Sequence, residues 1–301
     1  MNLTLPQAPA LLADSAVVQR AYDIEPFGYT HTLSGLDILS LDAICKQSEK
    51  HAPADYFVAG SAASPGTPFY DVRHGEVTPL QALQELGTHP NRVLLKRPER
   101  YSPAYRDLLE SLYEQVVALR GGPRRERLLR LDASILVSSA ATTTPFHFDP
   151  EISFFFQIEG AKSYHMYAPG TLGEAELEAF YIKGILNIGQ VELAGRPAAK
   201  RYTFELGPGK GMHQPRNSPH WVQTQNELSI SYVFSIETEA TRAQGRTRGF
   251  NYLERKLGLN PAQLGRRPQL DAMKAGVMHA AFGARDAARN ARETVRRLGA
   301  K

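Results

Sequence analysis

A histidine and an aspartate separated by one residue, His147 and Asp149, are the strongest candidates for chemistry in this 301-residue sequence. They lie in the stretch TTTPFHFDPEISFFFQIEG, directly before an apolar run. In an extended strand, residues i and i+2 point to the same side, so the imidazole and the carboxylate converge on one point. Two such ligands make up two-thirds of the 2-His-1-carboxylate triad, which holds Fe(II) and leaves positions open for a cosubstrate and oxygen.

The third ligand must come from another strand, and His220 is the preferred candidate. It begins the run HWVQTQNELSISYVF, which continues into the alternating pattern of a strand. His213 is the competing candidate, and we expect it to lie on a loop or to point away from the site. The spacing alone also fits a metal-free structural cupin, or a Zn or Mn site, because mixed sets of histidine and carboxylate ligands bind several divalent ions.

Two further residues have the chemistry to bind a cosubstrate. Lys162 lies thirteen residues after Asp149, on the next apolar strand. A lysine there would supply a cation with three donors for the far carboxylate of 2-oxoglutarate. Thr144, three residues before His147, could donate a hydroxyl to the same carboxylate. Taken alone, Lys162 would be a surface lysine in a turn, but in register with the triad it favours an iron site with a 2-oxoglutarate cosubstrate.

The run TPFHFDPEISFFFQIEGAKSYHMYAP resembles the cupin-like JmjC hydroxylases, a family that includes the asparaginyl hydroxylase of hypoxia-inducible factor. The PHWV segment around His220 also fits, and the resemblance is specific over about residues 135–236, a third of the chain. Ser153 departs from it, since the asparaginyl hydroxylase has Asn at this position, and this leaves the substrate class open. The matching positions are Thr144, Pro145, His147, Asp149, Phe154, Phe155, Gln157, Ile158, Gly160 and Lys162.

The resemblance implies an Fe(II)- and 2-oxoglutarate-dependent dioxygenase, in which His147, Asp149 and His220 are the metal ligands and the catalytic centre. O2 would be consumed, and succinate and CO2 would be released. Ser231, on the last strand, would contact the cosubstrate. The resemblance favours hydroxylation of a side chain on a protein or peptide. Two alternatives stay open: a hydroxylase of the same mechanism acting on a metabolite or natural product, and a non-catalytic cupin-like protein that binds a ligand or regulates a partner.

The chain is long enough to bury a substantial core, and we expect three segments. Residues 1–130 are predicted to form an N-terminal α/β region that packs on the core. Residues 131–240 are predicted to form a cupin/JmjC-like double-stranded β-helix, because short strands separated by turns follow one another as in a jelly roll. Residues 241–301 are predicted to form a basic helical region. The expected fold class is therefore mainly β with flanking helices.

Besides a short helix at residues 79–87, three helices are predicted within the first two segments. Residues 39–50 form the first, with Ser40 as its N-cap, and residues 102–120 the second, with Ser102 as its cap and a proline in its first turn. A third helix is expected as an insertion at 172–181. The second helix has an apolar stripe that should face the core, formed by Leu108, Leu109, Leu112, Val116 and Leu119.

The C-terminal region is basic on an otherwise acidic chain. Residues 242–301 hold 14 Lys and Arg against 4 Asp and Glu, or +10, whereas the first 241 residues hold 21 against 27, or −6. Helices are predicted at 250–259 and about 270–298, and an arginine face recurs at Arg285, Arg289, Arg292 and Arg296. A homodimer through this region is the favoured interpretation, ahead of contact with nucleic acid or the ribosome. Its apolar face would be Met273, Val277, Phe282 and Val295.

Other features of the sequence suggest the compartment. Cys45 is the single cysteine, so no intramolecular disulfide can form, which fits a reducing environment. The first residues lack the basic start of a signal peptide, and no run of about 18 apolar residues predicts a membrane span. We therefore expect a cytoplasmic protein.

Overall fold

The computed structural model describes residues 9–67, 77–123, 127–183, 196 and 200–298. The chain folds into two compact units. The first contains Met1–Thr171 and Leu186–Glu237, and the second contains Leu172–Ile185 and Thr238–Lys301. The division into three segments at residues 130 and 240 stays a prediction. None of the helices in the described part of the chain is long and apolar enough to cross a membrane.

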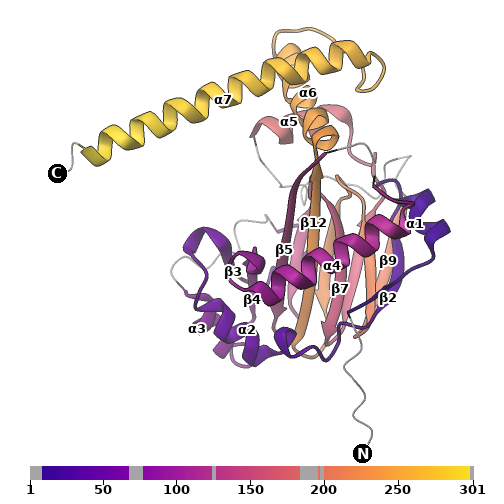
Figure 1. Cartoon of the computed structure of the whole chain (residues 1–301), viewed down its shortest axis with the longest axis vertical. Coiled ribbons are helices and arrows are strands. Elements are labelled where there is room, and N and C mark those ends of the chain that lie inside the picture. Colours follow the sequence, from indigo (N-terminus) through magenta and orange to yellow (C-terminus); the bar gives the residue numbers. More distant parts are fainter. Residues whose placement is uncertain (1–8, 68–76, 124–126, 184–195, 197–199, 299–301) are drawn as a thin grey trace, which may run out of the picture. The chain divides into compact units, whose positions relative to one another are not determined.

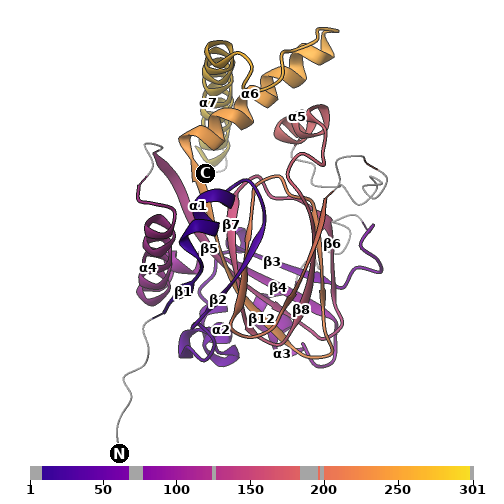
Figure 2. The same cartoon turned by 90° about the vertical axis from the view of Figure 1, so that its right-hand side faces the viewer.

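Two antiparallel sheets form the first unit, and their strands curve around a common interior (Figure 2). This is the double-stranded β-helix architecture that the strand pattern predicted. The smaller sheet has the order β6 (Thr143–His147), β11 (His220–Thr224), β8 (Lys162–Tyr167), β9 (Arg201–Leu206). The larger sheet has the order β1 (Leu11–Leu12), β2 (Phe27–His31), β10 (Lys210–Gln214), β7 (Ile152–Glu159), β12 (Ser229–Thr238), β5 (Leu128–Ser138), β4 (Asn91–Lys96), β3 (Tyr56–Gly60).

The larger sheet is covered on both faces, which explains its runs of apolar residues. On β7, Phe154 and Phe156 belong to the main hydrophobic core, while Phe155 points to the opposite face. There, Phe155 packs with residues of the smaller sheet such as Tyr164 and Val222. The predicted phenylalanine run is therefore core packing on both sides of one strand, as the two-residue period requires.

Helices cover the outer face of the larger sheet. α4 (Pro103–Leu119) lies across this face (Figure 1), and its predicted stripe is buried there from Leu108 to Val116. Ser102 was expected to cap α4, but its side chain makes no capping hydrogen bond. The proline at the first helical position already has the backbone angle of a helix, and this starts α4 instead. The other α-helices of the first unit are α1 (Ser15–Ala21), α2 (Leu41–Ser48) and α3 (Pro79–Gln84). Its short 3₁₀ helices include η1 (Asp37–Leu39), η2 (Pro53–Asp55) and η4 (Pro98–Arg100).

The start of α2 confirms the sequence prediction. Ser40 is its N-cap, and the Ser40 hydroxyl accepts a hydrogen bond from the backbone N–H of Ala43 at 3.3 Å. A side-chain acceptor at this position satisfies one of the unpaired N–H groups in the first turn of a helix.

The second unit consists of α5 (Glu174–Lys183), α6 (Glu239–Lys256) and α7 (Pro268–Leu298). α5 is the predicted helical insertion, and it packs with the C-terminal helices rather than forming part of a sheet. α6 begins eleven residues before the predicted helix at 250–259. Its Gly245 allows close packing, because a Cβ there would lie 2.6 Å from the ring of Tyr181 on α5.

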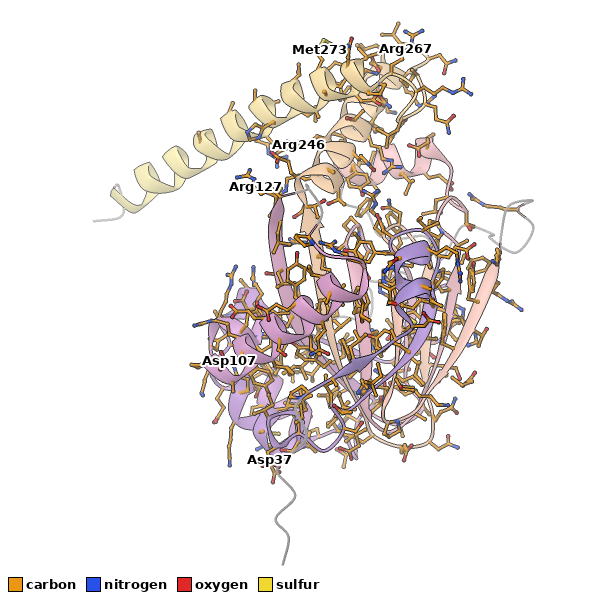
Figure 3. All side chains as sticks on the ribbon, turned by 45° about the vertical axis from the view of Figure 1, so that its right-hand side comes forward. Asp37, Asp107, Arg127, Arg246, Arg267 and Met273 are labelled. Carbon is orange, nitrogen blue, oxygen red and sulfur yellow. The ribbon has the colours of Figure 1, made fainter. Side chains whose placement is uncertain are left out.

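The proposed dimer face lies on α7. Met273 and Val277 are 56% and 49% exposed, and Figure 3 shows Met273 near the start of this helix. Arg285 lies over the ring of Phe282, with 5.1 Å between its guanidinium carbon and the ring centroid. The homodimer and the nucleic-acid or ribosome contact stay predictions. The side chains of Arg289, Arg292, Val295 and Arg296 lie outside the described residues.

Candidate metal centre

The three predicted ligands meet at one end of the smaller sheet. His147 is the last residue of β6 and His220 the first residue of β11, and the two are register partners. Asp149 follows two residues after His147, and its backbone carbonyl accepts a hydrogen bond from Asn217 at 2.7 Å. That bond ties the loop before β11 to the loop after β6. One ligand atom from each of His147, Asp149 and His220 lies within 4.8 Å of the others.

Both histidines direct a nitrogen lone pair away from the backbone. The Nδ1 of His147 lies 2.8 Å from the carbonyl of Pro145, and the Nδ1 of His220 lies 2.9 Å from the carbonyl of Ser218. A carbonyl can only accept, so each Nδ1 carries the proton and each Nε2 is left as a donor of electrons to a metal. The two rings are 4.1 Å apart between centroids, inclined at 58°.

A hydrogen-bonded chain orients Asp149. The amide of Gln214, on β10, donates to Asp149 Oδ2 at 3.0 Å, and the hydroxyl of Tyr164, on β8, donates to the amide oxygen of Gln214 at 2.6 Å. Asp149 Oδ2 lies 3.7 Å from Nε2 of His220. Outer partners of this kind fix the orientation of metal ligands. Sequence reasoning missed Gln214, one of several polar residues in a segment rich in glycine and proline.

The protonation states suit a divalent cation. Burial lowers the pKa of His147 to about 3 and also lowers the pKa of His220, so both rings are neutral at pH 7. For Asp149, burial acts to raise the pKa, but the two histidines and the Gln214 hydrogen bond together lower it. The site thus presents two neutral nitrogens and one carboxylate oxygen, the donor set of a facial triad.

His213 is not part of this site. Of the two predicted alternatives, a loop or an orientation away from the site, the second holds: His213 lies on strand β10 and points away from the triad. Its Nδ1 donates to the Ser153 carbonyl at 3.1 Å, and its Nε2 accepts from the backbone N–H of Asp23 at 2.9 Å. Its ring stacks on Tyr22, with 5.6 Å between centroids. Both nitrogens are satisfied, which leaves neither for a metal.

Lys162 is buried inside the barrel, with 3% of its surface exposed. It is the first residue of β8 and the register partner of Thr224 on β11, two residues from Val222, which faces the same interior. Its Nζ lies 5.6 Å from the ring centroid of Phe155. Burial, together with the positive charge of Arg92, lowers the pKa of Lys162 to about 7. Within the described residues, no carboxylate forms an ion pair with it.

The turn before Lys162 has a fixed shape. Gly160 adopts a φ of +65°, and a Cβ there would lie 2.0 Å from the carbonyl oxygen of Leu228. Glycine alone tolerates both the angle and the approach. The amide of Gln157 donates to the Gly160 carbonyl at 3.0 Å, so the sharp turn into β8 is held from inside the barrel.

Thr144 and Ser231 occupy different environments. Thr144 is half-buried on β6 and is the register partner of Val222, so it faces the same interior as Lys162. Ser231 is fully buried on β12, and its hydroxyl donates to the amide oxygen of Gln157 at 2.8 Å. That bond supports the turn at Gly160. Contacts of Thr144 and Ser231 with a cosubstrate stay predictions, and Ser153 pairs with Ser235 at 3.0 Å.

Arg92, on β4, is a further buried cation that sequence reasoning missed. It is 9% exposed, and its Nε donates to the carbonyl of Gly60 at 2.9 Å. Its Nη2 is buried and has no hydrogen-bond partner among the described residues. Burial lowers the pKa of Arg92 to about 10, so the side chain still carries its charge at neutral pH. The available signal was an arginine inside the apolar strand NRVLLK.

Comparison with known proteins finds one short segment of sequence similarity and a set of solved structures with low sequence identity. No family model matches the chain. A curated relative, HSPB1-associated protein 1 homolog of Danio rerio, is 26% identical over 117 residues, which cover 36% of this chain. The match spans about a quarter of that relative's length, 26%.

The solved structures that align with this chain include two of YcfD from Escherichia coli, described as a ribosomal oxygenase. One is in complex with cobalt and 2-oxoglutarate and has 15% identity and a TM-score of 0.49. The other is in complex with cobalt and succinic acid and has 15% identity and a TM-score of 0.47. Each alignment covers 91% of this chain and 68% of the other.

Proposed function

We propose that this protein is an Fe(II)- and 2-oxoglutarate-dependent oxygenase that hydroxylates its substrate. The observation that carries the proposal is the convergence of His147, Asp149 and His220 in one barrel with the buried cation Lys162. A buried charge without a counter-ion costs several kcal/mol, of the order of 5. An anionic ligand that binds beside a metal triad accounts for such a lysine, whereas a purely structural cupin does not.

Each residue of the site would have its own role. His147 and His220 would bind the metal through Nε2, and Asp149 through a carboxylate oxygen. Fe(II) with 2-oxoglutarate, when bound, supplies the oxidising chemistry and releases succinate and CO2. Lys162 would bind the far carboxylate of the cosubstrate and so direct its keto acid end toward the triad.

Two further features support this arrangement. The chain from Tyr164 through Gln214 holds the Asp149 carboxylate in one orientation. Phe155, Met212 and Val222 form an apolar cluster inside the barrel that restricts water. The selection of iron over zinc comes from the cosubstrate lysine, because the triad alone accepts several divalent ions.

The test is an anaerobic titration of the protein with Fe(II) and 2-oxoglutarate, followed by visible absorption. We expect a weak charge-transfer band that requires both components and is absent in Asp149→Ala, with both proteins shown to be folded by circular dichroism. A folded wild-type protein that gives no band would refute the oxygenase and favour a non-catalytic cupin or another metal.

For the substrate, we propose a side chain of a protein or peptide, which the sequence resemblance favours over a small molecule. Turnover under 18O2 would place the label on the hydroxylated product. Proteins and metabolites from a cell extract, treated with wild-type enzyme or Asp149→Ala, are then compared by mass spectrometry. Label in a protein side chain supports the proposal, and label only in a small molecule supports the alternative.

A further inference from the structure

Arg92 and Lys162 face the same barrel interior from opposite sheets. On β4, the neighbours Val93 and Leu95 belong to the core beneath the helices, so Arg92 points to the other face of the larger sheet. Lys162 points inward from the smaller sheet, toward Phe155 on the larger one. The two side chains therefore enter one space from two sides.

Their charges act on each other. Arg92 lowers the pKa of Lys162, as a like charge must. It lowers the pKa of His147 as well. Arg92 thus lies near enough to both the cosubstrate lysine and the triad for its charge to be felt at each.

Neither cation has a protein counter-ion in the described part of the chain. The guanidinium of Arg92 donates to the Gly60 carbonyl through Nε, while its buried Nη2 finds no partner among the described residues. The ammonium of Lys162 contacts the face of an aromatic ring. Burying two like charges together, with donors left over on both, is costly, and an anion bound between them would offset that cost.

We propose that Arg92 and Lys162 form an anion pocket that binds one carboxylate between them, and that this pocket binds without any metal in the triad. The identity of the ligand rests on the proposed function: the carboxylate is the far end of 2-oxoglutarate, which succinate shares. The charge arrangement itself does not depend on the metal.

The hydrogen-bond donors of the two side chains suit a single carboxylate. A carboxylate has two oxygens, so one can accept from Nη2 of Arg92 while the other accepts from Nζ of Lys162. Succinate retains this carboxylate after the keto acid end has been lost. Succinate should therefore bind the metal-free protein and compete with 2-oxoglutarate, and Arg92 should determine how tightly it does so.

The experiment is a calorimetric titration of succinate into the full chain, in a chelator and without chloride or phosphate. Wild-type protein should bind succinate, and Arg92→Gln should bind it at least tenfold more weakly, because a charge-assisted hydrogen bond is lost. Arg92→Lys keeps the charge but loses the planar set of N–H donors of the guanidinium, so its affinity for succinate should lie between those of wild type and Arg92→Gln. Arg20→Gln, at an exposed arginine on α1, is the matched control and should bind like wild type.

A thermal melt without ligand checks folding and gives a second readout. Arg92→Gln removes an uncompensated buried charge, so its melting temperature should not fall below that of wild type. A well-folded Arg92→Gln protein with wild-type succinate affinity would overturn the proposal, and would direct Arg92 toward a substrate carboxylate instead.

The outcome separates this inference from the oxygenase assignment. Metal-independent succinate binding that depends on Arg92, combined with no Fe(II)–2-oxoglutarate band, would keep the anion pocket and remove the oxygenase. A normal band with no succinate binding in the chelator would keep the oxygenase and remove the pocket.

Discussion

The barrel interior and the helical unit both bury cations, but they treat them differently. In the helical unit, Lys274 is 1% exposed and its Nζ contacts Glu254 at 2.5 Å and Asn251 at 2.7 Å. Arg248, 9% exposed, makes two hydrogen bonds to Glu174, each at 2.9 Å. In the barrel, neither Arg92 nor Lys162 has a carboxylate partner among the described residues.

The difference distinguishes structural charges from functional ones. A buried ion pair between helices has its counter-ion within the folded chain. A buried cation without a carboxylate partner gains a counter-ion only when an anionic ligand binds. The same distinction holds for neutral groups: both ring nitrogens of His213 have hydrogen-bond partners, while Nε2 of His220 has only the Asp149 carboxylate, 3.7 Å away. Burial is similar in these pairs, so the presence of a carboxylate partner, rather than burial, distinguishes the two groups of cations.

The largest effect is expected from removing the carboxylate of the triad. Asp149→Ala should reduce Fe(II)-dependent succinate formation to background, because two neutral imidazoles remain as the only protein ligands. Turnover is measured as succinate released from 2-oxoglutarate, with and without a chelator. Asp149→Glu is the conservative comparison and should retain a part of the metal affinity. Activity in Asp149→Ala that survives at the wild-type level would end the assignment of the triad.

Lys162→Met should weaken ligand binding while raising the stability of the unliganded protein. It therefore tests most directly the difference between paired and unpaired buried cations. The affinity for 2-oxoglutarate should fall about 100-fold, because a charge-assisted hydrogen bond to its carboxylate is lost. The unliganded protein should become more stable by about 1 kcal/mol, since an unpaired buried charge has been replaced by an apolar chain of similar length. Calorimetry and chemical denaturation measure the two effects.

The exposed lysine Lys50 provides the matched control, and Lys50→Met should change neither quantity. If Lys162→Met destabilises the unliganded protein, the ammonium has a structural role, and the contrast with Lys274 disappears.

Removing the carboxylate partner of the buried cation Lys274 should lower the stability of the protein, whereas Lys162→Met should raise it. Glu254→Gln leaves Lys274 buried with only Asn251 as a strong partner, so the free energy of unfolding should fall by about 2 kcal/mol. Thermal and urea unfolding of the full chain measure this. Glu110→Gln, at an exposed glutamate on α4, should change it by less than about 0.5 kcal/mol. An equally stable Glu254→Gln protein would show that the buried pair contributes nothing, and that pairing is a poor criterion here.

The sequence predicted the parts of the site that are close together along the chain. His147, Asp149 and Lys162 fall within the short stretch from the end of β6 to the start of β8, where the two-residue period and the Gly160 turn fix their directions. His220 was found because its strand alternates clearly. The fold class followed from the regular succession of short strands, and the buried stripe of α4 from its helical spacing.

The remaining parts depend on contacts between distant segments. Arg92 is identified as an interior residue only by the register of β4 against β5 and β3, and Gln214 only by the pairing of β10 with β7. A segment as rich in glycine and proline as the one around His213 hides a strand, because β10 is stabilised by its neighbours β2 and β7 rather than by its own residue preferences. The helical unit likewise unites α5 with helices that begin more than fifty residues later.

The smallest effect, a pH dependence of cosubstrate binding, tests whether the lysine is uncompensated before the ligand arrives. In the unliganded protein, burial and Arg92 hold the pKa of Lys162 at about 7, well below its ordinary value. Below pH 7 the ammonium is already charged, so the affinity for 2-oxoglutarate should be nearly constant. Above pH 7 the amine must take up a proton to bind the carboxylate, so the affinity should fall as the pH rises, by at most about tenfold per unit.

Among neighbouring groups, Glu151 titrates in the same window, because burial and the charge of Asp149 raise its pKa to about 7, and the Lys162→Arg control separates its contribution. The pKa of Arg92 is about 10 and that of His147 is about 3, and burial lowers the pKa of His220 below its ordinary value. Titrations between pH 6 and 9 in two buffers of different ionisation enthalpy measure both the affinity and the proton uptake. Lys162→Arg stays protonated over this range, so its binding should lose the pH dependence and take up no proton. A wild-type affinity that is flat to pH 9 would mean that Lys162 is already charged in the empty barrel, and therefore that a protein group or another anion compensates it.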